Sequence, residues 1–468
     1  MPTANSLPSP PNNLMKIARL ALFSLASLSL ALRLAAQQPS EPFRPDGKPD
    51  PKYPVPDELS LSYAISFALD NNFAIRQARE RIRQQEGVVV EVSARSIPNV
   101  AATGAYQHND TTLSQTFPAS DRSWQIALTA SQTLYAGGGV RSAVKSSQLA
   151  RDAAVLDLQS AINDALLQVR TAFYSVLLAR EKINVQEKNL ELLGSQLKTT
   201  TDRFDAGTVS SFEKLRAEVA LANAKVPLIT AKNDYRLAIE SLRQALGFTT
   251  NKDEAVRKIP NFVGTLDYTP VNFDLQAAFD AAHANRPDLQ RLAKLSSARE
   301  ESIVAARSNY YPTVSAFGGW QLRKGATNDF GDSKDGWLVG VQSQWNIFDG
   351  RATAGRVSQA RSALEQTRLT FTEAQLAAEV EVRRAFSSWQ QATELADASK
   401  KVVEQAEESV RLANARYNAG TGTQLDVLSA QVDLTTARTN QIQAYFNYNV
   451  AVAALRKATG QADEFVTR

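Results

Sequence analysis

The fold is decided by a short stretch that occurs twice, as Arg203-Phe204-Asp205-Ala206-Gly207-Thr208 and again as Arg416-Tyr417-Asn418-Ala419-Gly420-Thr421. The copies are 213 residues apart, and the same offset relates two further pairs: Trp124 with Trp337, and Leu246-Gly247 with Thr459-Gly460. A constant offset over this length indicates an internal repeat. We therefore predict two tandem units over residues 59–247 and 273–460, joined by a linker over residues 248–272.

Each unit is predicted to contain the same elements in the same order. An opening amphipathic helix ends where a proline follows, two strands come next, and a very long helix then turns into a returning helix. In the first unit the opening helix covers 59–96, the strands about 98–109 and 122–135, the long helix 140–205 and the return helix 211–247. In the second unit the strands cover about 312–323 and 337–348, the long helix 352–418 and the return helix 424–459, followed by a tail over 461–468.

The long helices carry the strongest periodic signal. In the first one, apolar or small residues alternate at spacings of 3 and 4, as in Ile162, Ala165, Val169, Ala172, Val176 and Ala179. A 3.5-residue repeat keeps one stripe facing a partner helix, as in a coiled coil. We expect the partner to be the return helix, whose Phe212, Leu215, Val219, Ala222, Val226 and Ile229 continue the spacing. The alternative is an ordinary helical bundle, although a helix over 140–205 would be roughly 100 Å long at 1.5 Å per residue.

The predicted strands alternate between an apolar face and a small polar face, which is typical of half-buried strands. Each run is long enough for a tilted strand to cross a bilayer, and four tryptophans suit the membrane interfaces: Trp124, Trp320, Trp337 and Trp345. Four strands are too few to close a membrane barrel, and open edges are not tolerated in lipid, so several protomers would have to combine. The alternative is a small soluble sheet. The predicted fold class is mainly α with a membrane β-barrel.

The N-terminus has the pattern of a secretory signal peptide over residues 1–36, followed by a proline-rich, extended lead-in over residues 37–58. Removing residues 1–36 would remove Lys16, Arg19 and Arg33 and no acid, lowering the net charge from +4 to +1. The basic isoelectric point therefore gives no indication of nucleic-acid binding. The absence of cysteine excludes disulfides, thiol catalysis and a lipid-modified N-terminal cysteine.

No catalytic, metal or cofactor site is predicted. The two histidines, His108 and His283, have no ligand-spaced partner. The run Gly137-Gly138-Gly139 lacks the lysine and hydroxyl residue that follow in a phosphate loop. We expect a protein that is not an enzyme.

The duplicated turn motif and the order of elements over residues 59–460 resemble the TolC-like outer-membrane efflux protein family. The resemblance implies a homotrimer, a trimeric α/β barrel with twelve strands in the outer membrane of a Gram-negative-type cell, and a helical tunnel in the periplasm. It implies that the linker over 248–272 forms an equatorial belt. It also implies that the hairpin tips, with Arg203, Gly207, Thr208, Arg416, Gly420 and Thr421, dock a periplasmic adaptor protein that connects the duct to an inner-membrane transporter.

The tip residues by themselves indicate a helix-hairpin turn. Gly207 and Gly420 suit a left-handed backbone at a helix end, and Thr208 and Thr421, or Ser210, can cap the next helix. The resemblance further implies an acidic ring at the periplasmic entrance from Glu213 and Asp426, although an acid in a first helical turn also simply favours the helix dipole. Ser429 and Gly422 depart from the family pattern, so a second acidic ring and a basic latch are not expected.

The predicted function is the outer-membrane channel component of a tripartite efflux or type I secretion system. It would be a passive exit duct through the periplasm, gated at its helical tips. The alternative is a periplasmic coiled-coil scaffold or adaptor that is not a channel. The exported substrate is left open by the sequence.

Overall fold

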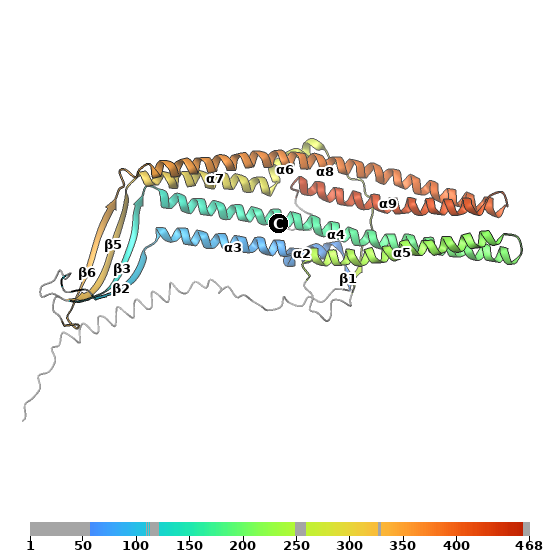
Figure 1. The fold of residues 1–468 in the computed structure, drawn as a ribbon. Coiled ribbons are helices and arrows are strands. Elements are labelled where there is room, and N and C mark those ends of the chain that lie inside the picture. Colours follow the sequence, from blue (N-terminus) through green and yellow to red (C-terminus); the bar gives the residue numbers. More distant parts are fainter. Residues whose placement is uncertain are drawn as a thin grey trace, which may run out of the picture. The chain divides into compact units, whose positions relative to one another are not determined.

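A computed structural model describes residues 57–108, 110, 112, 121–248, 259–325 and 329–461 (Figure 1). The predicted signal peptide, most of the lead-in, the first part of the linker and nearly all of the tail lie outside the described residues.

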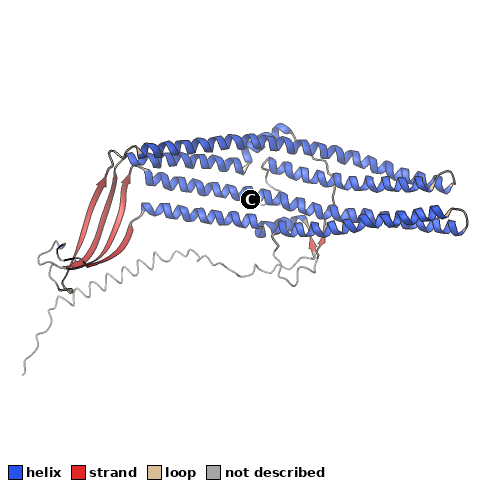
Figure 2. Ribbon diagram, in the orientation of Figure 1, coloured by secondary structure: helices blue, strands red, loops and turns tan. Residues whose placement is uncertain are grey.

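The two halves contain the same series of elements (Figure 2). The first half consists of β1 (Glu58–Leu59), α2 (Leu61–Asn71), α3 (Phe73–Ser93), the short 3-10 helix η1 (Ala94–Ser96), β2 (Asn99–His108), β3 (Arg122–Ala136), α4 (Gly139–Asp205) and α5 (Ser211–Leu246). The second half consists of β4 (Asn261–Phe262), α6 (Leu275–Asn285), α7 (Pro287–Arg307), η3 (Ser308–Tyr310), β5 (Thr313–Lys324), β6 (Ser333–Gln344), α8 (Ala352–Asn418) and α9 (Gln424–Ala458).

The helices α4 and α8 form the long axis of the described unit, with 67 residues each. At a rise of 1.5 Å per residue each is about 100 Å long. Towards the sheet, α4 packs between α3 and α7, and α7 also packs on α8. Towards the tips, α5 packs on α4, and α9 packs on both α8 and α4 (Figure 1). Each long helix is therefore packed along its length by shorter helices that follow one another end to end.

The prediction of one continuous opening helix is wrong, because the chain breaks it into α2 and α3 at Asn72. The Asn72 side chain accepts hydrogen bonds from Ala74 N and Ile75 N and donates to the Ala245 carbonyl at 2.7 Å. The break makes room for the end of the return helix, where a Cβ on Gly247 would lie 2.3 Å from the Asn71 oxygen. In the second half α6 and α7 are separated in the same way, at Arg286.

The predicted packing face of the return helix is also wrong. Between Ser211 and Ala231, the buried residues of α5 are alanines spaced seven apart: Ala217, Ala224 and Ala231. Nearer its end, Ile239, Leu242, Ala245 and Leu246 are buried as well. Five of the six residues assigned to the seam are large and exposed: Phe212 (67%), Leu215 (58%), Val219 (51%), Val226 (63%) and Ile229 (66%). Alanines let α5 approach α4 closely, so the large side chains point elsewhere. On α4 itself, seam residues such as Val169 and Val176 are buried as predicted.

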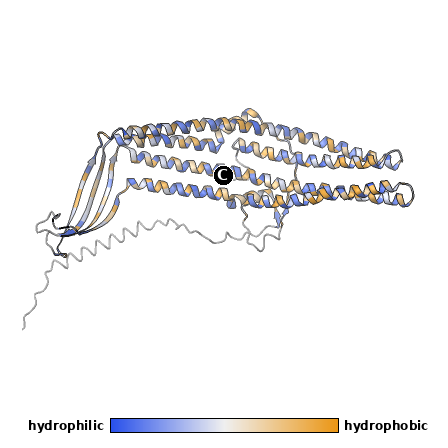
Figure 3. Cartoon of the chain, viewed as in Figure 1, coloured by the Kyte–Doolittle hydropathy of each residue, from blue (hydrophilic) through white to orange (hydrophobic). Residues whose placement is uncertain are grey.

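The four long strands form one antiparallel sheet in the order β2-β3-β5-β6. Its pairing brings Tyr106 opposite Trp124, and Trp320 opposite Trp337. The register places these four aromatic residues on one face, together with the other apolar positions of the alternation: Val100, Ile126, Leu128, Val339 and Val341. The opposite face is richer in Gly, Ser, Thr and Gln. Hydrophobic and hydrophilic residues accordingly alternate along the strands in Figure 3.

The last strand lies four residues earlier than predicted, over Ser333–Gln344 instead of 337–348. Its first residues pair with β5, as Ser333 does with Lys324. Its end is set by the residues that follow, because Trp345 donates its ring N–H to the Tyr310 carbonyl at 3.0 Å and Asp349 binds Thr353 at the start of α8. Trp345 therefore lies just past the strand, at the junction of sheet and helices.

The main hydrophobic core lies at mid-length, around Phe173 and Val176 of α4. It is covered by α2, the end of α5 and the two-stranded parallel sheet β1-β4, whose Phe262 packs edge-on against Phe173. Arg180 holds this small sheet to α4 by donating to the carbonyls of Phe262 and Gly264, both at 2.7 Å. Among the described residues, none of the helices combines the length and apolar character needed to cross a membrane.

Candidate functional site

The first hairpin tip is closed by backbone geometry at Gly207. The Gly207 N–H donates to the Phe204 carbonyl and the Thr208 N–H to the Arg203 carbonyl, both at 2.9 Å, which is the pattern of a Schellman helix end. It requires the left-handed φ of +72° that Gly207 adopts. The Thr208 hydroxyl also donates to the Arg203 carbonyl, and Ser210 caps α5. Of the candidate caps, Ser210 is the right one for this helix and Thr208 is not.

The second tip repeats the turn with a stronger cap. Gly420 has a φ of +75°, and the N–H groups of Thr421 and Gly422 both donate to the Arg416 carbonyl at 3.0 Å. The cap of α9 is Thr423, not the predicted Thr421. Thr423 and Asp426 form a capping box, in which each side chain accepts from the other residue's backbone N–H.

The two tips touch each other through the side chains of the duplicated motif. The Arg203 guanidinium lies 4.6 Å from the centre of the Tyr417 ring and donates to the Asn418 amide oxygen at 3.0 Å. One turn further in, Gln424 donates to the buried Thr200 hydroxyl at 3.2 Å. A cation over an aromatic ring and a neutral hydrogen bond contribute about 1 kcal/mol each, and a hydrogen bond from a charged guanidinium contributes about 1.5–3 kcal/mol. The contact between the hairpins is therefore modest in strength.

The seam between the tips is polar, and it is incompletely satisfied. Four buried side-chain atoms there have no hydrogen-bond partner among the described residues: Gln196 Nε2, Tyr417 OH, Gln424 Oε1 and Gln431 Oε1. Each buried group without a partner costs on the order of 1–3 kcal/mol. The hairpins therefore meet across a mixed surface, in which these polar atoms lie beside an apolar contact of Leu193 of α4 and Ala224 of α5 with Leu428 of α9.

The predicted acidic residues occupy different settings. Glu213 is half-buried in the first turn of α5, where its N–H donates to Ser210 Oγ. Asp426 is exposed and forms the capping box. At least part of its role is therefore to stabilise the N-terminus of α9, as expected of an acid in a first helical turn. Hydrogen bonds from the backbone and hydroxyl of Thr423 lower the pKa of Asp426 below its ordinary value. The carboxyl is therefore ionised at neutral pH.

Asp426 also lines a groove of about 700 Å³ between α8 and α9, which the sequence did not predict. Its other acidic residues are Glu404, Glu408 and Asp433, and Arg416 is the single basic one among the lining residues. Asp433 follows Asp426 by two helical turns on one face of α9, with Ser429 between them. The groove therefore carries a negative charge even though Ser429 replaces an acid of the family pattern.

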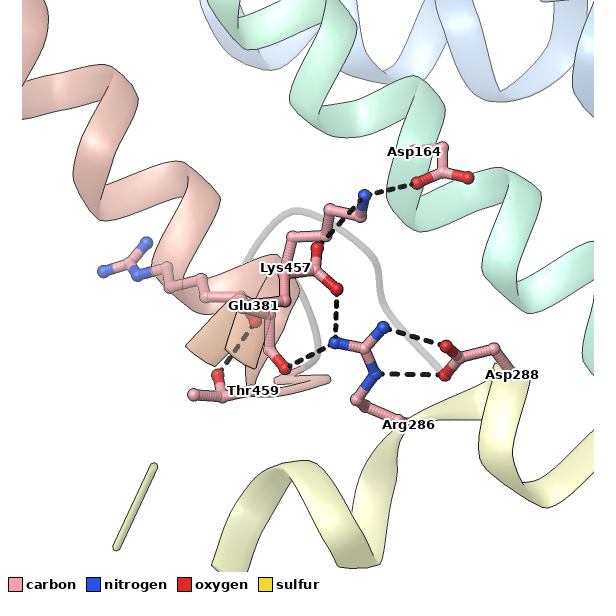
Figure 4. A network of polar contacts seen from close by, with 8 residues as sticks. Asp164, Arg286, Asp288, Glu381, Lys457 and Thr459 are labelled. Atoms are coloured by element: carbon pink, nitrogen blue, oxygen red, sulfur yellow. Dashed lines mark hydrogen bonds and ion pairs between the residues drawn. The ribbon is translucent and has the colours of Figure 1, made fainter. Parts of the chain in front are cut away.

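A charged network at mid-length was also not predicted (Figure 4). Arg286 donates to both oxygens of Asp288 at 2.8 and 3.1 Å, to Glu381 at 2.7 Å and to the Ala458 carbonyl at 3.2 Å. Lys457 adds a contact to Asp164 of α4 at 2.8 Å. The network joins α4, α7, α8 and α9 at the helix break of the second half.

Mutual neutralisation keeps this network ionised. Burial by itself would raise the pKa of Asp288, but the hydrogen bonds and charge of Arg286 lower it below the ordinary value. Burial would lower the pKa of Lys457, yet the bond to Asp164 raises it. In the first half, the residue that corresponds to Arg286 is the neutral Asn72. No charged residue therefore repeats at this position, and the repeat did not indicate the network.

The sequence comparisons agree with the geometry. The model of the family described as outer membrane efflux protein matches residues 64–248 and 278–461. CyaE of Bordetella pertussis is 24% identical over 86% of this chain and 85% of its own length. The outer membrane protein TolC of Escherichia coli is 27% identical over 64% of this chain and 62% of its own length.

Solved structures show the same fold. The CmeC outer membrane channel of Campylobacter jejuni has a TM-score of 0.74 at 16% identity, covering 86% of this chain and 87% of that one. The family match extends over both halves, and the family is one of channel and transport proteins. The chain belongs to the outer membrane efflux protein family and is the outer-membrane channel component of a tripartite efflux system.

Proposed function

We propose that the protein works as a homotrimer enclosing a passive aqueous path that opens at its periplasmic hairpin tips. The observation that carries the proposal is a stripe of large apolar residues on α5 that no described part of the same chain covers: Phe212, Leu215, Val219, Val226, Ile229 and Leu237, each 51–67% exposed. This set is called the α5 stripe below. An apolar surface of this extent on a rigid helix favours an interface with another chain.

The sheet supports the same arrangement. Among the described residues its edge strands, β2 and β6, pair with no further strand in one protomer, and an even number of strands lets β6 pair antiparallel with β2 of a neighbour. The two edges are different surfaces, so the contact is head-to-tail and a ring results if it closes. Two copies would give eight strands, a barrel whose interior is filled by side chains. Three copies give twelve strands and leave room for a path.

The helices offer a second surface for the α5 stripe. At the level of α5, on the tip half of α8, Leu395, Val402 and Leu412 are 47–50% exposed. In the order of packing, α5 and α8 are separated by α4 and α9, so a stripe on α5 meets α8 of the next protomer in a ring. The apolar face of the sheet, with Trp124, Trp320 and Trp337, would face lipid, and Trp345 would mark the periplasmic interface.

The tips supply the gate and the docking site in this proposal. Their turns are rigid, since Gly207 and Gly420 are held by duplicated backbone hydrogen bonds, while the hairpins meet across the polar seam described above. Moving one hairpin against the other would separate the apolar contact of Leu193 with Leu428, the Arg203–Tyr417 contact and the hydrogen bonds at Asn418 and Thr200. Arg203, Thr208, Arg416 and Thr421 at the exposed ends would contact a periplasmic adaptor, through which the duct reaches an inner-membrane transporter. Glu213 and Asp426 would form the acidic entrance.

The test is conductance in a planar lipid bilayer. Purified protein should give discrete steps, and a Glu213→Ala, Asp426→Ala variant should change the preference for cations. A Glu86→Ala, Glu91→Ala variant is the matched control, because it removes the same charge from exposed positions on α3. Absence of steps from a folded trimer would reject the channel mechanism. Unchanged cation selectivity in the tip variant would reject the acidic entrance alone.

A further inference from the structure

A pocket at the junction of sheet and helices has the composition of an anion site. It has a volume of about 350 Å³ and is lined by Arg307, Tyr310, Tyr311, Ala354, Val357, Ser358 and Arg361. Two arginines and two tyrosines supply hydrogen-bond donors, and no carboxylate is among the lining residues. Arginine guanidinium groups bind phosphate through paired hydrogen bonds.

In the part of the chain that the structure describes, neither Arg307 nor Arg361 makes an ion pair or a side-chain hydrogen bond. Nearby acids contact other residues, as Glu300 does Arg368 at 2.9 Å and Asp349 does Thr353, and the exposed Glu365, one turn beyond Arg361 on α8, makes no ion pair with it among the described residues. The first turns of α8 also line the pocket, and the start of a long helix adds a partial positive charge. An added anion would relieve the repulsion between the two guanidinium groups.

The position of the pocket indicates where that anion comes from. Trp345 donates to the Tyr310 carbonyl, and the apolar face of the sheet begins at the same level. Trp337 precedes Trp345 by 8 residues. At about 3.3 Å per residue and a strand tilt of roughly 40°, the two tryptophans are separated by about 20 Å along the barrel axis. This separation is close to the height of the apolar band of a membrane barrel. The pocket thus lies at the depth where lipid headgroups meet the helices.

The pocket is specific to the second half of the duplication. At the offset of 214, which relates Pro98 to Pro312, Arg307 corresponds to Ser93, and at 213 Arg361 corresponds to Gln148. Tyr310 and Tyr311 correspond to Ser96 and Ile97. The same backbone therefore exists without the four donors, so the fold does not need them.

We propose that this pocket binds the phosphate group of an anionic membrane phospholipid, with Arg307 and Arg361 holding the phosphate and Tyr310 and Tyr311 contacting the headgroup. The proposal rests on the membrane position of the sheet given under the proposed function. Three such sites, one per protomer, would anchor the ring at one leaflet of the bilayer.

The experiment titrates the full-length protein in an uncharged detergent with dioleoyl phosphatidylglycerol and counts bound lipid per protomer by native mass spectrometry. Dioleoylglycerol, which lacks the phosphate, is the lipid control. An Arg307→Gln, Arg361→Gln variant should bind phosphatidylglycerol about tenfold or more weakly, as expected for losing charge-assisted hydrogen bonds. An Arg95→Gln, Arg299→Gln variant has the same change in charge at exposed positions outside the pocket and should bind like the parent protein.

The outcomes separate this site from the channel. Equal retention of phosphatidylglycerol by the parent protein and the Arg307→Gln, Arg361→Gln variant would overturn the proposal, as would equal binding of dioleoylglycerol. Displacement of the lipid by inorganic phosphate at similar concentration would show a site for free phosphate and overturn the lipid assignment. Bilayer conductance should be unchanged in the variant, so loss of lipid binding with normal conductance supports the site. If the variant lost both lipid binding and conductance, the idea that the site serves only to anchor the ring would be overturned.

Discussion

The α5 stripe leads to a prediction about assembly that a single substitution can test. Val226 is 63% exposed in the protomer, whereas Ala224, two residues away, is 8% exposed and packs between α5 and its neighbours. Val226→Glu should therefore leave the protomer folded and prevent formation of the trimer. Ala224→Glu should instead disrupt the hairpin of α4 and α5 itself.

The size of the effect follows from the exposed area. Full burial of a valine side chain contributes about 1.5–3 kcal/mol, so covering the part of Val226 that is still exposed contributes about 1–2 kcal/mol at each interface. Three interfaces close the proposed ring, which makes about 3–6 kcal/mol per trimer before the cost of dehydrating three carboxylates is added. Since 1.4 kcal/mol is a factor of ten, association should weaken by at least about a hundredfold.

The assay is size-exclusion chromatography with light scattering in detergent, together with far-UV circular dichroism. Lys225→Glu is the control, because this neighbouring exposed residue lies outside the α5 stripe. A Val226→Glu protein that remains trimeric would refute the interface. A protein that loses its helical signal would show that the large residues face α4, as the sequence alone had suggested.

Three further predictions concern stability, each measured by chemical unfolding followed by circular dichroism. Arg286→Asn introduces the residue found at the corresponding position of the first half and should lower the unfolding free energy by about 2–3 kcal/mol. The reason is that Asp288, whose side chain is about a third exposed, loses two charge-assisted hydrogen bonds. A loss below about 0.5 kcal/mol would contradict this expectation. Gly207→Ala should cost about 1 kcal/mol, since its φ is +72° but no atom lies within 4 Å of the new Cβ. Gly247→Ala should cost clearly more, because its Cβ would collide with the backbone of Asn71, and equal losses at both glycines would refute the steric argument. Folding lowers the pKa of Asp288, so the stability that its carboxylate contributes is fully present above the pKa of the unfolded chain. The unfolding free energy should therefore fall as the pH drops through the pKa of Asp288 in the folded protein. Asp288→Asn should flatten the plot of unfolding free energy against pH over this range.

Much of the fold could be predicted because its signals are local. The spacing of 3 and 4 along α4, the period of two in the strands, and the turn at Gly207 each depend on residues close together in the chain. The predicted bounds of α4 and α8 differ from the observed ones by at most one residue. The break at Asn72 was missed, although Asn72 is a good helix cap and follows another asparagine, because the helical pattern continues on both sides.

The tip turns could be predicted from the sequence, but their surroundings could not. Gly207 and Gly420 take the left-handed backbone expected of them. The caps are Ser210, one of the predicted candidates, and Thr423, which was not predicted. The threonine directly after each glycine instead directs its hydroxyl back to the preceding helix. The groove beside Asp426 lies within the predicted hairpin of α8 and α9, but the helical spacing did not indicate that four acids and a single arginine would line it.

By itself, the sequence determined the duplication, the lengths of the long helices, the alternation of the strands and the position of the tips. Only the tertiary structure decided which face of α5 meets α4. Both the alanines at 217, 224 and 231 and the large residues at 212, 219 and 226 recur every seven residues, so either set satisfies a coiled-coil repeat. Close approach of the helix axes selects the alanines, and the apolar residues left outside become the surface available to another protomer.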